Sequence, residues 1–417
     1  DLSSLAEGKV EAKATATDPA GNQAHDTANS TLDVTGPSVD IEHFAGDDGF
    51  INTSESTATP VSGTSSEKTV DLVFTDVNGK TVEVKNVSVV DGKWSTTADL
   101  SSLAEGKVEA KATATDPAGN QAHDTANSTL DVTGPAVDIE HFAGDDGYIN
   151  TAESTATPVS GTSSEKTVDL TFTDVNGKVV TVTGVTVVDG KWSTTADLSN
   201  LAEGKVEAKA TATDPAGNQA HDTANSTLDV TGPTVDIEHF AGDDGYINTS
   251  ESTATPVSGT SSEKTVDLTF TDVNGKVVTV TGVTVVDGKW STSADLSSLA
   301  EGKVEAKATA TDPAGNQAHD TANSTLDVTG PSVDIEHFAG DDGFINTSES
   351  TATPVSGTSS EKTVDLVFTD VNGKTVEVKN VSVVDGKWST SADLSSLAEG
   401  KVEAKATATD PAGNQAH

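Results

Sequence analysis

The sequence repeats with a fixed period of 98 residues, and this period limits what the chain can fold into. The segment DLSSLAEGKVEAKATATDPAGNQAH starts at Asp1, and near-copies start at Asp99, Asp197, Asp295 and Asp393. A unit of this length matches a small β-sandwich domain of roughly 100 residues and is much longer than a solenoid repeat of about 20–50 residues. We therefore expect separate domains in tandem, each with its own core. Near-verbatim copies of one domain add length, and a unique catalytic pocket is not expected.

Short β-branched runs separated by Gly, Asn, Asp and Pro predict an all-β chain of tandem immunoglobulin-like Greek-key β-sandwich domains in an extended linear array. The period places complete repeats at 37–134, 135–232 and 233–330. Residues 331–417 would form a repeat without its last strand, and residues 1–36 only the last two strands of another. We expect the sequence to be part of a longer array.

The chain is strongly acidic, with 24 basic and 66 acidic residues and a formal net charge of −42 at pH 7. Residues 37–134 alone hold 16 acids and 6 lysines, a net charge of −10, so the acidity belongs to the repeat. Nucleic acid is excluded as a partner, because phosphate binding needs a basic surface. Binding to an anionic membrane surface is disfavoured for the same reason. The acids form either a solvated, salt-adapted surface or, in part, sites for divalent cations.

The chain contains neither Cys nor Met. A disulfide framework and a thiolate metal site are therefore excluded. The sequence shows no signal peptide and no apolar run long enough to insert into a membrane. The lack of Cys fits an exported protein that does not use disulfides, and any export signal would lie outside these residues.

In the repeat 37–134, the alternation of apolar and polar residues predicts strands near 38–44, 58–63, 69–75, 93–98, 107–115 and 128–133. Asn78-Gly79 predicts a two-residue hairpin with a type I′ turn, and Asp91-Gly92 a second tight turn. The run between these turns changes its alternation at Asn86, which predicts a β-bulge or a strand switch. Trp94 is expected in the core, and a sugar-stacking role is the less favoured alternative.

Strands are lettered in chain order, so that strand A is the first of a repeat and strands F and G are the last two. The A–B loop (residues 46–55) reads GDDGFINTSE, the F–G turn (116–121) reads DPAGNQ, and the linker (131–138) reads DVTGPAVD. Antiparallel threading places the A–B loop and the departing strand G at the far end of the repeat. The F–G turn lies at the near end, beside the preceding repeat. The A–B loop, the linker and the next F–G turn should therefore meet at each junction.

Oxygen-bearing side chains would gather at such a junction. Between the second and third complete repeats they are Asp145, Asp146, Asn150, Glu153, Asp229, Asp236, Asp312 and Asn316. Carboxylates at this density repel one another unless a cation lies between them. Six to eight hard oxygen ligands suit Ca²⁺, whereas Mg²⁺ is stricter in geometry, and zinc lacks Cys or paired His ligands. Alternatively, Asp-Pro-Ala-Gly-Asn is a stable turn by itself and Asp-Asp-Gly is common in solvated loops.

The candidate Ca²⁺ ligands fall into three sets. The A–B loops contribute Asp47, Asp48, Asn52, Glu55, Asp145, Asp146, Asn150, Glu153, Asp243, Asp244, Asn248, Glu251, Asp341, Asp342, Asn346 and Glu349. The F–G turns contribute Asp18, Asp116, Asn120, Asp214, Asn218, Asp312, Asn316 and Asp410. The linkers contribute Asp33, Asp40, Asp131, Asp138, Asp229, Asp236, Asp327 and Asp334.

Three strings resemble the bacterial immunoglobulin-like extender repeats of giant secreted adhesins of the repeats-in-toxin type, including the stalks of marine ice-binding adhesins. They are GDDGYINTAE (144–153), DGKW (189–192) and KATATDPAGN (209–218), and the resemblance covers the whole chain. It implies a secreted stalk, extracellular or attached to the bacterial cell surface, that Ca²⁺ makes rigid at the interdomain junctions and that holds a distal ligand-binding region away from the cell. It also implies Asp47, Asp48, Asn52, Glu55, Asp116 and their copies as calcium positions.

Two other kinds of function remain as alternatives. A repetitive carbohydrate- or surface-binding module would use Phe50, Tyr148 and Tyr246, although these aromatics could instead pack across a junction. Direct ice binding through rows such as Thr113 and Thr115 is less favoured, because twisted strands make poor flat arrays. An enzyme is least expected, because no nucleophile pattern surrounds His43 or His123 and no residue set lies outside the repeat. The expected partners are neighbouring repeats of the same chain.

Overall fold

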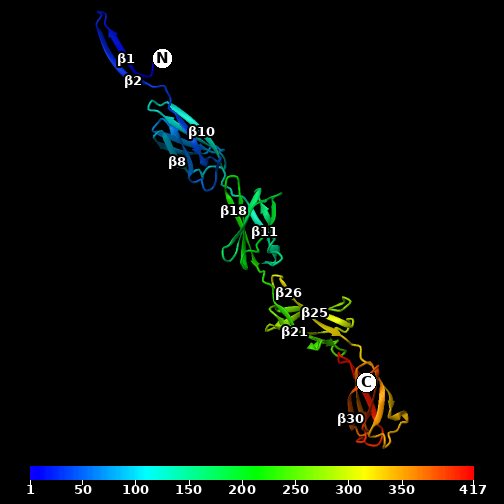
Figure 1. Ribbon diagram of the computed structural model, residues 1–417. Coiled ribbons are helices and arrows are strands. Elements are labelled where there is room, and N and C mark those ends of the chain that lie inside the picture. The colour runs from blue at the N-terminus through cyan, green and yellow to red at the C-terminus, as the bar shows by residue number, and fades with distance from the viewer. The chain divides into compact units, whose positions relative to one another are not determined.

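The computed structural model describes the backbone of residues 1–417 and every side chain except those of Asp47, Asp145, Asp243 and Asp341. It divides into two compact units, Asp1–Leu228 and Asp229–His417. The regular elements are β-strands and four short 3-10 turns, and the strands form sandwich layers (Figure 1), which confirms the predicted all-β class of tandem β-sandwich domains. The structure describes no helix that has the length and the apolar surface needed to cross a membrane.

The first unit begins with a hairpin of β1 (Gly8–Thr17) and β2 (Gln23–Leu32), which pair over ten residues. In the repeat 37–134 the strands follow the order β3-β5-β8-β7-β6-β9-β10-β4. They form one sheet because β7 pairs with β6 in one layer and with β8 in the other. Strands A, B, F and G are β3, β5, β9 and β10. The bounds are β3 (Val39–Phe44), η1 (Ala45–Asp47), β4 (Phe50–Ile51), β5 (Thr59–Ser65), β6 (Thr69–Thr75), β7 (Thr81–Val90), β8 (Lys93–Ala98), β9 (Gly106–Thr115) and β10 (Gln121–Leu130).

The repeat 135–232 has the same strands in two separate sheets, β11-β13-β16 and β12-β18-β17-β14-β15. The sheets are separate because the strand equivalent to β7 ends at Thr186, and only the isolated bridge between Val188 and Lys191 follows. The bounds are β11 (Val137–Phe142), η2 (Ala143–Asp145), β12 (Tyr148–Ile149), β13 (Thr157–Ser163), β14 (Thr167–Thr173), β15 (Val179–Thr186), β16 (Lys191–Ala196), β17 (Gly204–Thr213) and β18 (Gln219–Leu228).

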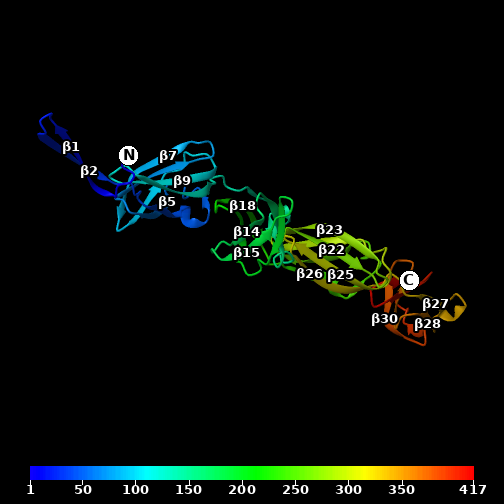
Figure 2. The same ribbon diagram turned by 90° about the horizontal axis from the view of Figure 1, so that it is seen from above.

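The second unit contains one sheet of the eight-stranded order and one of seven strands. Strands β22, β23, β25 and β26 lie side by side in the first of them (Figure 2). The bounds are β19 (Val235–Phe240), η3 (Ala241–Asp243), β20 (Tyr246–Ile247), β21 (Thr255–Ser261), β22 (Thr265–Thr271), β23 (Val277–Val286), β24 (Lys289–Ala294), β25 (Gly302–Thr311), β26 (Gln317–Leu326), β27 (Val333–Phe338), η4 (Ala339–Asp341), β28 (Thr353–Ser359), β29 (Thr363–Thr369), β30 (Thr375–Val384), β31 (Lys387–Ala392), β32 (Glu403–Thr409) and β33 (Gln415–Ala416).

Trp94 lies in the core between the layers, as predicted. Its side chain is 2% exposed, and its indole Nε1 donates to the carbonyl of Thr64 at 3.1 Å. Gly63 makes this packing possible, because a Cβ atom there would lie 1.9 Å from the carbonyl oxygen of Asp40 and 2.7 Å from the indole ring. A buried indole cannot serve as a sugar-stacking surface, so that alternative role of Trp94 is wrong.

The observed strands agree with the predicted ones except at strand G. The alternation on β9 is confirmed, with the alanines of its inner face fully buried. Strand β10, however, begins at Gln121 and ends at Leu130, whereas we predicted 128–133. The segment QAHDTAN contains few apolar residues, but it pairs with β9 residue by residue, so backbone hydrogen bonding overrides its weak strand propensity. The two-residue β4, which pairs parallel to β10, was not predicted.

The turn at Asn78-Gly79 is not of type I′. Only Gly79 has a positive φ, of 81°, and its N–H donates to the carbonyl of Asp76 at 3.0 Å. The Asp76 carboxylate accepts the N–H groups of Asn78 and Lys80 at 2.8 and 2.9 Å. These bonds favour a type I turn over Val77 and Asn78, followed by a glycine in the left-handed region.

The other two predictions for this part of the repeat are confirmed. Asp91 and Gly92 both have a positive φ, of 50° and 77°, as a type I′ turn requires. Asn86 has φ 59° where the pairing of β6 with β7 shifts register, which is a β-bulge. The last two residues of β7 pair with β8, so the strand also switches layers. The Asp71 carboxylate fixes the bulge by accepting the N–H of Asn86 at 2.8 Å.

Candidate calcium sites at the ends of the repeats

The A–B loop is ordered by its own polar side chains. Asn52 Oδ1 accepts the N–H groups of Ser54 and Glu55 at 2.9 and 3.2 Å, and Glu55 Oε2 accepts the N–H of Asn52 at 3.1 Å. This reciprocal pair is a capping box for the turn that follows. Asp48 Oδ1 accepts the N–H of Phe50 at 2.8 Å. The equivalent bonds recur at Asp146, Asn150, Glu153, Asp244, Asn248, Glu251, Asp342, Asn346 and Glu349.

The loop folds back on itself at Gly46. This residue has φ 69°, a backbone conformation in which glycine is favoured. A Cβ atom at Gly46 would lie 3.4 Å from Glu55 Oε1, so the glutamate lies against the start of the loop. The predicted ligand side chains next to these glycines, Asp47, Asp145, Asp243 and Asp341, lie outside the described residues.

In the F–G turn, Asp116 is clamped by Asn120. Its two carboxylate oxygens accept the backbone N–H and the Nδ2 of Asn120, both at 2.8 Å. Partial burial raises the pKa of Asp116, but the hydrogen bonds from Asn120 and from the turn backbone outweigh it and hold that pKa below its ordinary value. Asp18, Asp214, Asp312 and Asp410 accept the same bonds from the asparagine four residues later.

The three predicted segments meet at a junction in each unit. In the first unit, Asn52 Nδ2 donates to the carbonyl of Ala216 at 3.1 Å, and the Thr53 N–H donates to Asn218 Oδ1 at 2.9 Å. The Thr53 hydroxyl bonds to the linker carbonyl of Val132 at 3.1 Å. The linker carbonyl of Asp131 accepts Asn218 Nδ2 at 2.8 Å. The second unit has the equivalent four bonds at Asn248, Thr249, Asp327, Val328, Ala412 and Asn414.

The linker aspartates take part in these contacts through their backbone carbonyls. The carbonyls of Asp33 and Asp229 accept the Nδ2 groups of Asn120 and Asn316 at 3.1 and 2.8 Å. The Asp229 side chain accepts the N–H of Thr231 at 3.3 Å within the linker. Main-chain carbonyls are good Ca²⁺ ligands, so the linker can offer oxygens of both kinds.

Asp40 is placed beside Asp124 of the same repeat. Asp124 Oδ2 accepts the N–H of Ile41 at 2.8 Å, which joins strand G to strand A. Loss of solvent contact and the neighbouring Asp124 carboxylate raise the pKa of Asp40. The linker aspartates Asp138 and Asp236 have a raised pKa for the same reasons beside Asp222 and Asp320, and Asp334 holds the same position on β27. The sequence analysis assigned no role to Asp124, because the predicted strand G began at residue 128 and did not include it. The observed β10 begins at Gln121 and does include it.

Among the side chains that the structure describes, no three His, Asp or Glu residues are close enough together to hold a metal ion. The donor chemistry at the junctions nevertheless fits Ca²⁺ better than any softer ion. The A–B loop, F–G turn and linker contain carboxylate, amide and carbonyl oxygens, and no Lys occurs in them. Hard oxygen donors of this kind are the ligands that Ca²⁺ prefers.

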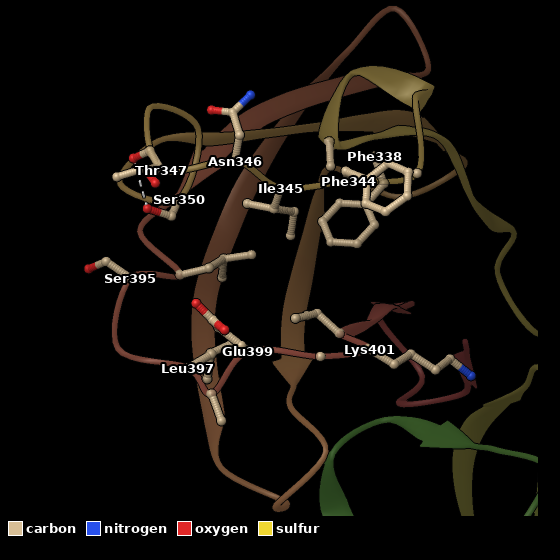
Figure 3. Close-up of a pocket in the computed structure, with 16 residues that line it drawn as sticks. Phe338, Phe344, Ile345, Asn346, Thr347, Ser350, Ser395, Leu397, Glu399 and Lys401 are labelled. Carbon is tan, nitrogen blue, oxygen red and sulfur yellow. Dashed lines mark hydrogen bonds between the residues drawn. The ribbon is translucent and has the colours of Figure 1, made fainter.

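A hollow of about 850 Å³ opens in the repeat 331–417 (Figure 3). Phe338, Phe344 and Ile345 line it from one side and Leu397 from the other, in the close-up view. The equivalents of Phe338, Ile345 and Leu397 in the repeat 37–134 belong to the buried core that Leu130 of β10 closes. The hollow is therefore uncovered core beside the two-residue strand β33, and polar residues such as Asn346, Ser395 and Glu399 also line it.

The sequence pattern of the bacterial Ig-like domain (group 3) family matches residues 92–179 and 190–277. No match was found among proteins of curated function. The chain is similar to a solved tetra-tandem repeat from the extending region of a large adhesion protein, with 30% identity, 91% of this chain and 96% of the other covered, and a TM-score of 0.33.

Two further solved structures are similar to the chain. One is a Ca²⁺-stabilised adhesin that helps an Antarctic bacterium reach out and bind ice, with 29% identity, coverage of 92% and 97%, and a TM-score of 0.37. The other comes from work on host cell surface retention of a 1.5-MDa bacterial ice-binding adhesin, with 26% identity, coverage of 70% and 98%, and a TM-score of 0.30. The 98-residue period, the sandwich topology and the family match lead to one conclusion: the chain belongs to the bacterial Ig-like domain family.

Proposed function

We propose that the chain is a structural extender of a large bacterial adhesin, which acts outside the cell and carries a distal ligand-binding region away from the cell surface. The observation that carries this proposal is the junction, where the A–B loop of one repeat, the linker and the next F–G turn meet in the same way in both units. Because the same domain and the same junction recur, each repeat would fix the position of the next repeat along the chain. The same role is named for the extending region of the large adhesion protein to which the chain is 30% identical.

Calcium is proposed to stiffen these junctions. Without a cation, the carboxylates of Asp48, Glu55, Asp131 and Asp214 add negative charge to segments that contain no Lys. A bound Ca²⁺ would neutralise this charge and link segments of two repeats. It would also stabilise the folded chain by mass action. Extracellular modules bind Ca²⁺ with a Kd of about 10⁻⁴–10⁻³ M, so such a junction would be filled outside the cell and empty inside it.

The proposed ligands come from the three segments that meet. In the first unit they are Asp47, Asp48 and Glu55 of the A–B loop, with Asp214 of the F–G turn and the linker at Asp131. Asn52 and Asn218 are assigned a different part, because each has one side-chain oxygen that already accepts at least two hydrogen bonds at 2.6–3.2 Å, whereas a carboxylate has two oxygens and about four acceptor positions. They would hold the loop and the turn in place for the carboxylates.

Calcium removal tests the proposal. Small-angle scattering and thermal unfolding of the 417-residue chain are measured in EDTA and again with about 1–5 mM CaCl₂, which is roughly one to five times the weaker Kd above. We expect Ca²⁺ to increase the maximum dimension and the melting temperature. Calorimetric titration counts the ions per repeat. An unchanged maximum dimension and melting temperature would contradict calcium stiffening.

Two controls make this test specific. Mg²⁺ at the same concentrations should have a smaller effect, because it is smaller and demands stricter geometry. Glu83→Gln removes a carboxylate from β7, where it lies opposite Val73 within β6 and away from the A–B loop, the F–G turn and the linker, and it should not change the Ca²⁺ response. If the chain, at roughly 1 μM, bound to glycans on an array, this result would favour the carbohydrate-binding alternative instead.

A further inference from the structure

The side-chain amide of Asn218 forms a complete hydrogen-bonded connection between two repeats. Asn218 is 7% exposed. Its Nδ2 donates to the carbonyl of Asp131 at 2.8 Å and to Asp214 Oδ2 at 3.0 Å. Its Oδ1 accepts the N–H and the hydroxyl of Thr53 at 2.9 and 2.8 Å. The Thr53 hydroxyl has one proton, which it shares between Asn218 Oδ1 and the carbonyl of Val132 at 3.1 Å. With this shared bond, all four hydrogen-bonding positions of the amide have a partner.

These four bonds reach three chain segments of two repeats. Thr53 belongs to the A–B loop of the preceding repeat, Asp131 to the linker, and Asp214 to the F–G turn of the following repeat. Beside them, Asn52 Nδ2 donates to the carbonyl of Ala216, the middle residue of the same turn. The second unit repeats the arrangement with distances that agree within 0.1 Å, at Thr249, Asp327, Asp410, Ala412 and Asn414.

Only the asparagine side chain has both the length and the donors and acceptors that these neighbours require. Aspartate would lose both donors and would bring a second carboxylate against Asp214 and the carbonyl oxygen of Asp131. An apolar side chain would leave a buried carbonyl and a carboxylate without their partner, which costs free energy. Thr53 supplies two donors from one residue, so Asn-Thr in the A–B loop and Asn at the end of the F–G turn are complementary.

We propose that Asn218 and Asn414 are junction latches, which select the Asn-Thr pair of the preceding repeat as docking partner and hold the two repeats together without a cation. The latch is formed entirely by protein groups. Calcium at the neighbouring carboxylates would restrict the motion that remains. The latch concerns the same junction as the proposed function but does not depend on calcium, so the two can fail separately.

Spin labels on either side of the junction test the latch in the full-length chain. Because the chain contains no Cys, Ser88→Cys and Thr186→Cys place one label on each of two successive repeats, both at exposed strand positions. The distance distribution between the labels is measured by pulsed electron paramagnetic resonance, in EDTA and in millimolar Ca²⁺. The variants are Asn218→Asp, Thr53→Val and, as control, Asn78→Asp in an exposed hairpin turn.

The latch predicts a narrow distance distribution in EDTA for the unsubstituted chain and for Asn78→Asp. Asn218→Asp and Thr53→Val should lose the narrow distribution, while circular dichroism stays that of the parent. Thr53→Val keeps the test valid if Asn218→Asp disturbs its own turn, because Thr53 is exposed and lies in the other repeat.

Two outcomes would overturn the latch. One is a distribution in EDTA that is as broad for the parent as for Asn218→Asp, and the other is a narrow distribution in every variant. If the distance distributions of the parent and the variants are all broad in EDTA and Ca²⁺ narrows all of them, calcium stiffening stands and the latch fails. If the parent is narrow in EDTA, the variants are broad and Ca²⁺ changes nothing, the latch stands and calcium stiffening fails.

Discussion

The same ten residues, GDDGFINTSE, occur at 46–55 and at 340–349 in two different surroundings. In the first copy Ile51 is fully buried and β4 pairs with β10. In the second copy Phe344 is 76% exposed, Ile345 is half-buried and no strand forms over residues 344–345. The bonds inside the loop are nevertheless the same, including the capping box at Asn346 and Glu349. Local side chains thus build the loop, and strand G with the next repeat buries it.

Removing the residue that closes the core should make the first copy behave like the second. Leu130 is 1% exposed, and Leu130→Ala should destabilise the repeat 37–134 by about 2–5 kcal/mol. Hydrogen exchange of residues 49–52, measured by mass spectrometry on the whole chain, should then approach that of residues 343–346. Leu32→Ala is the matched control, because Leu32 ends the identical strand β2 in a hairpin and is only half-buried. Unchanged exchange at 49–52 in Leu130→Ala would contradict this account.

Removing the capping asparagine should produce a smaller difference in hydrogen exchange between the two copies of the loop. Asn52→Ala and Asn346→Ala each lose the capping box, which costs about 1 kcal/mol. Asn52→Ala also loses the bond to Ala216 of the next repeat. Local exchange of residues 53–58 should therefore increase more than that of residues 347–352. Equal increases would mean that the contact with the next repeat adds nothing to the stability of the loop.

In the hairpin turn that begins at Asp76 or Asp370, at the same end of the repeat as the A–B loop, the two copies should not differ. Asp76 and Asp370 accept the N–H groups of Ala104 and Ala398, then two more in their own turns, and these bonds lower both pKa values from 3.8. A lowered pKa in the folded state means that the carboxylate stabilises the fold above its ordinary pKa. That stabilisation is lost as the pH falls below 3.8 through the lowered value.

Carboxyl titration by NMR should give both aspartates a pKa below the ordinary value, with similar shifts. The melting temperature of Asp76→Asn should depend less on pH in this range than that of the parent. If Asp370 titrates normally while Asp76 does not, the open core of the repeat 331–417 also changes the hairpin turn beside it, where Asp370 accepts the N–H of Ala398.

Most of the fold could be predicted from the sequence, and the errors have a common cause. Strands with β-branched alternation, such as 69–75 and 93–98, were predicted with their observed bounds. Strand G was predicted too short because QAHDTAN gains its strand conformation from pairing with β9. The type I′ turn at Asn78-Gly79 was wrong because the carboxylate of Asp76, which is 6% exposed, selects another turn. Each error concerns a segment whose conformation depends on a partner outside it.

The candidate site also has features that the sequence could predict and features that depend on tertiary contacts. That Asn52, Thr53 and Asn218 would lie near each other followed from antiparallel threading alone. That the asparagine amides would be used up in hydrogen bonds, and that Asp40 would face Asp124, depended on distances of about 3 Å that threading cannot provide. The calcium positions remain a prediction.

By itself, the sequence determined the domain period, the sandwich class, the alternating core residues and the loops that cap themselves. These depend on contacts between residues close in the chain, or on a period that any copy repeats. Only the tertiary structure decided which loop copy is buried, how long strand G is, and which amide connects two repeats. Those features depend on groups far apart in sequence, whose hydrogen bonds and burial exist only after the strands and repeats have come together.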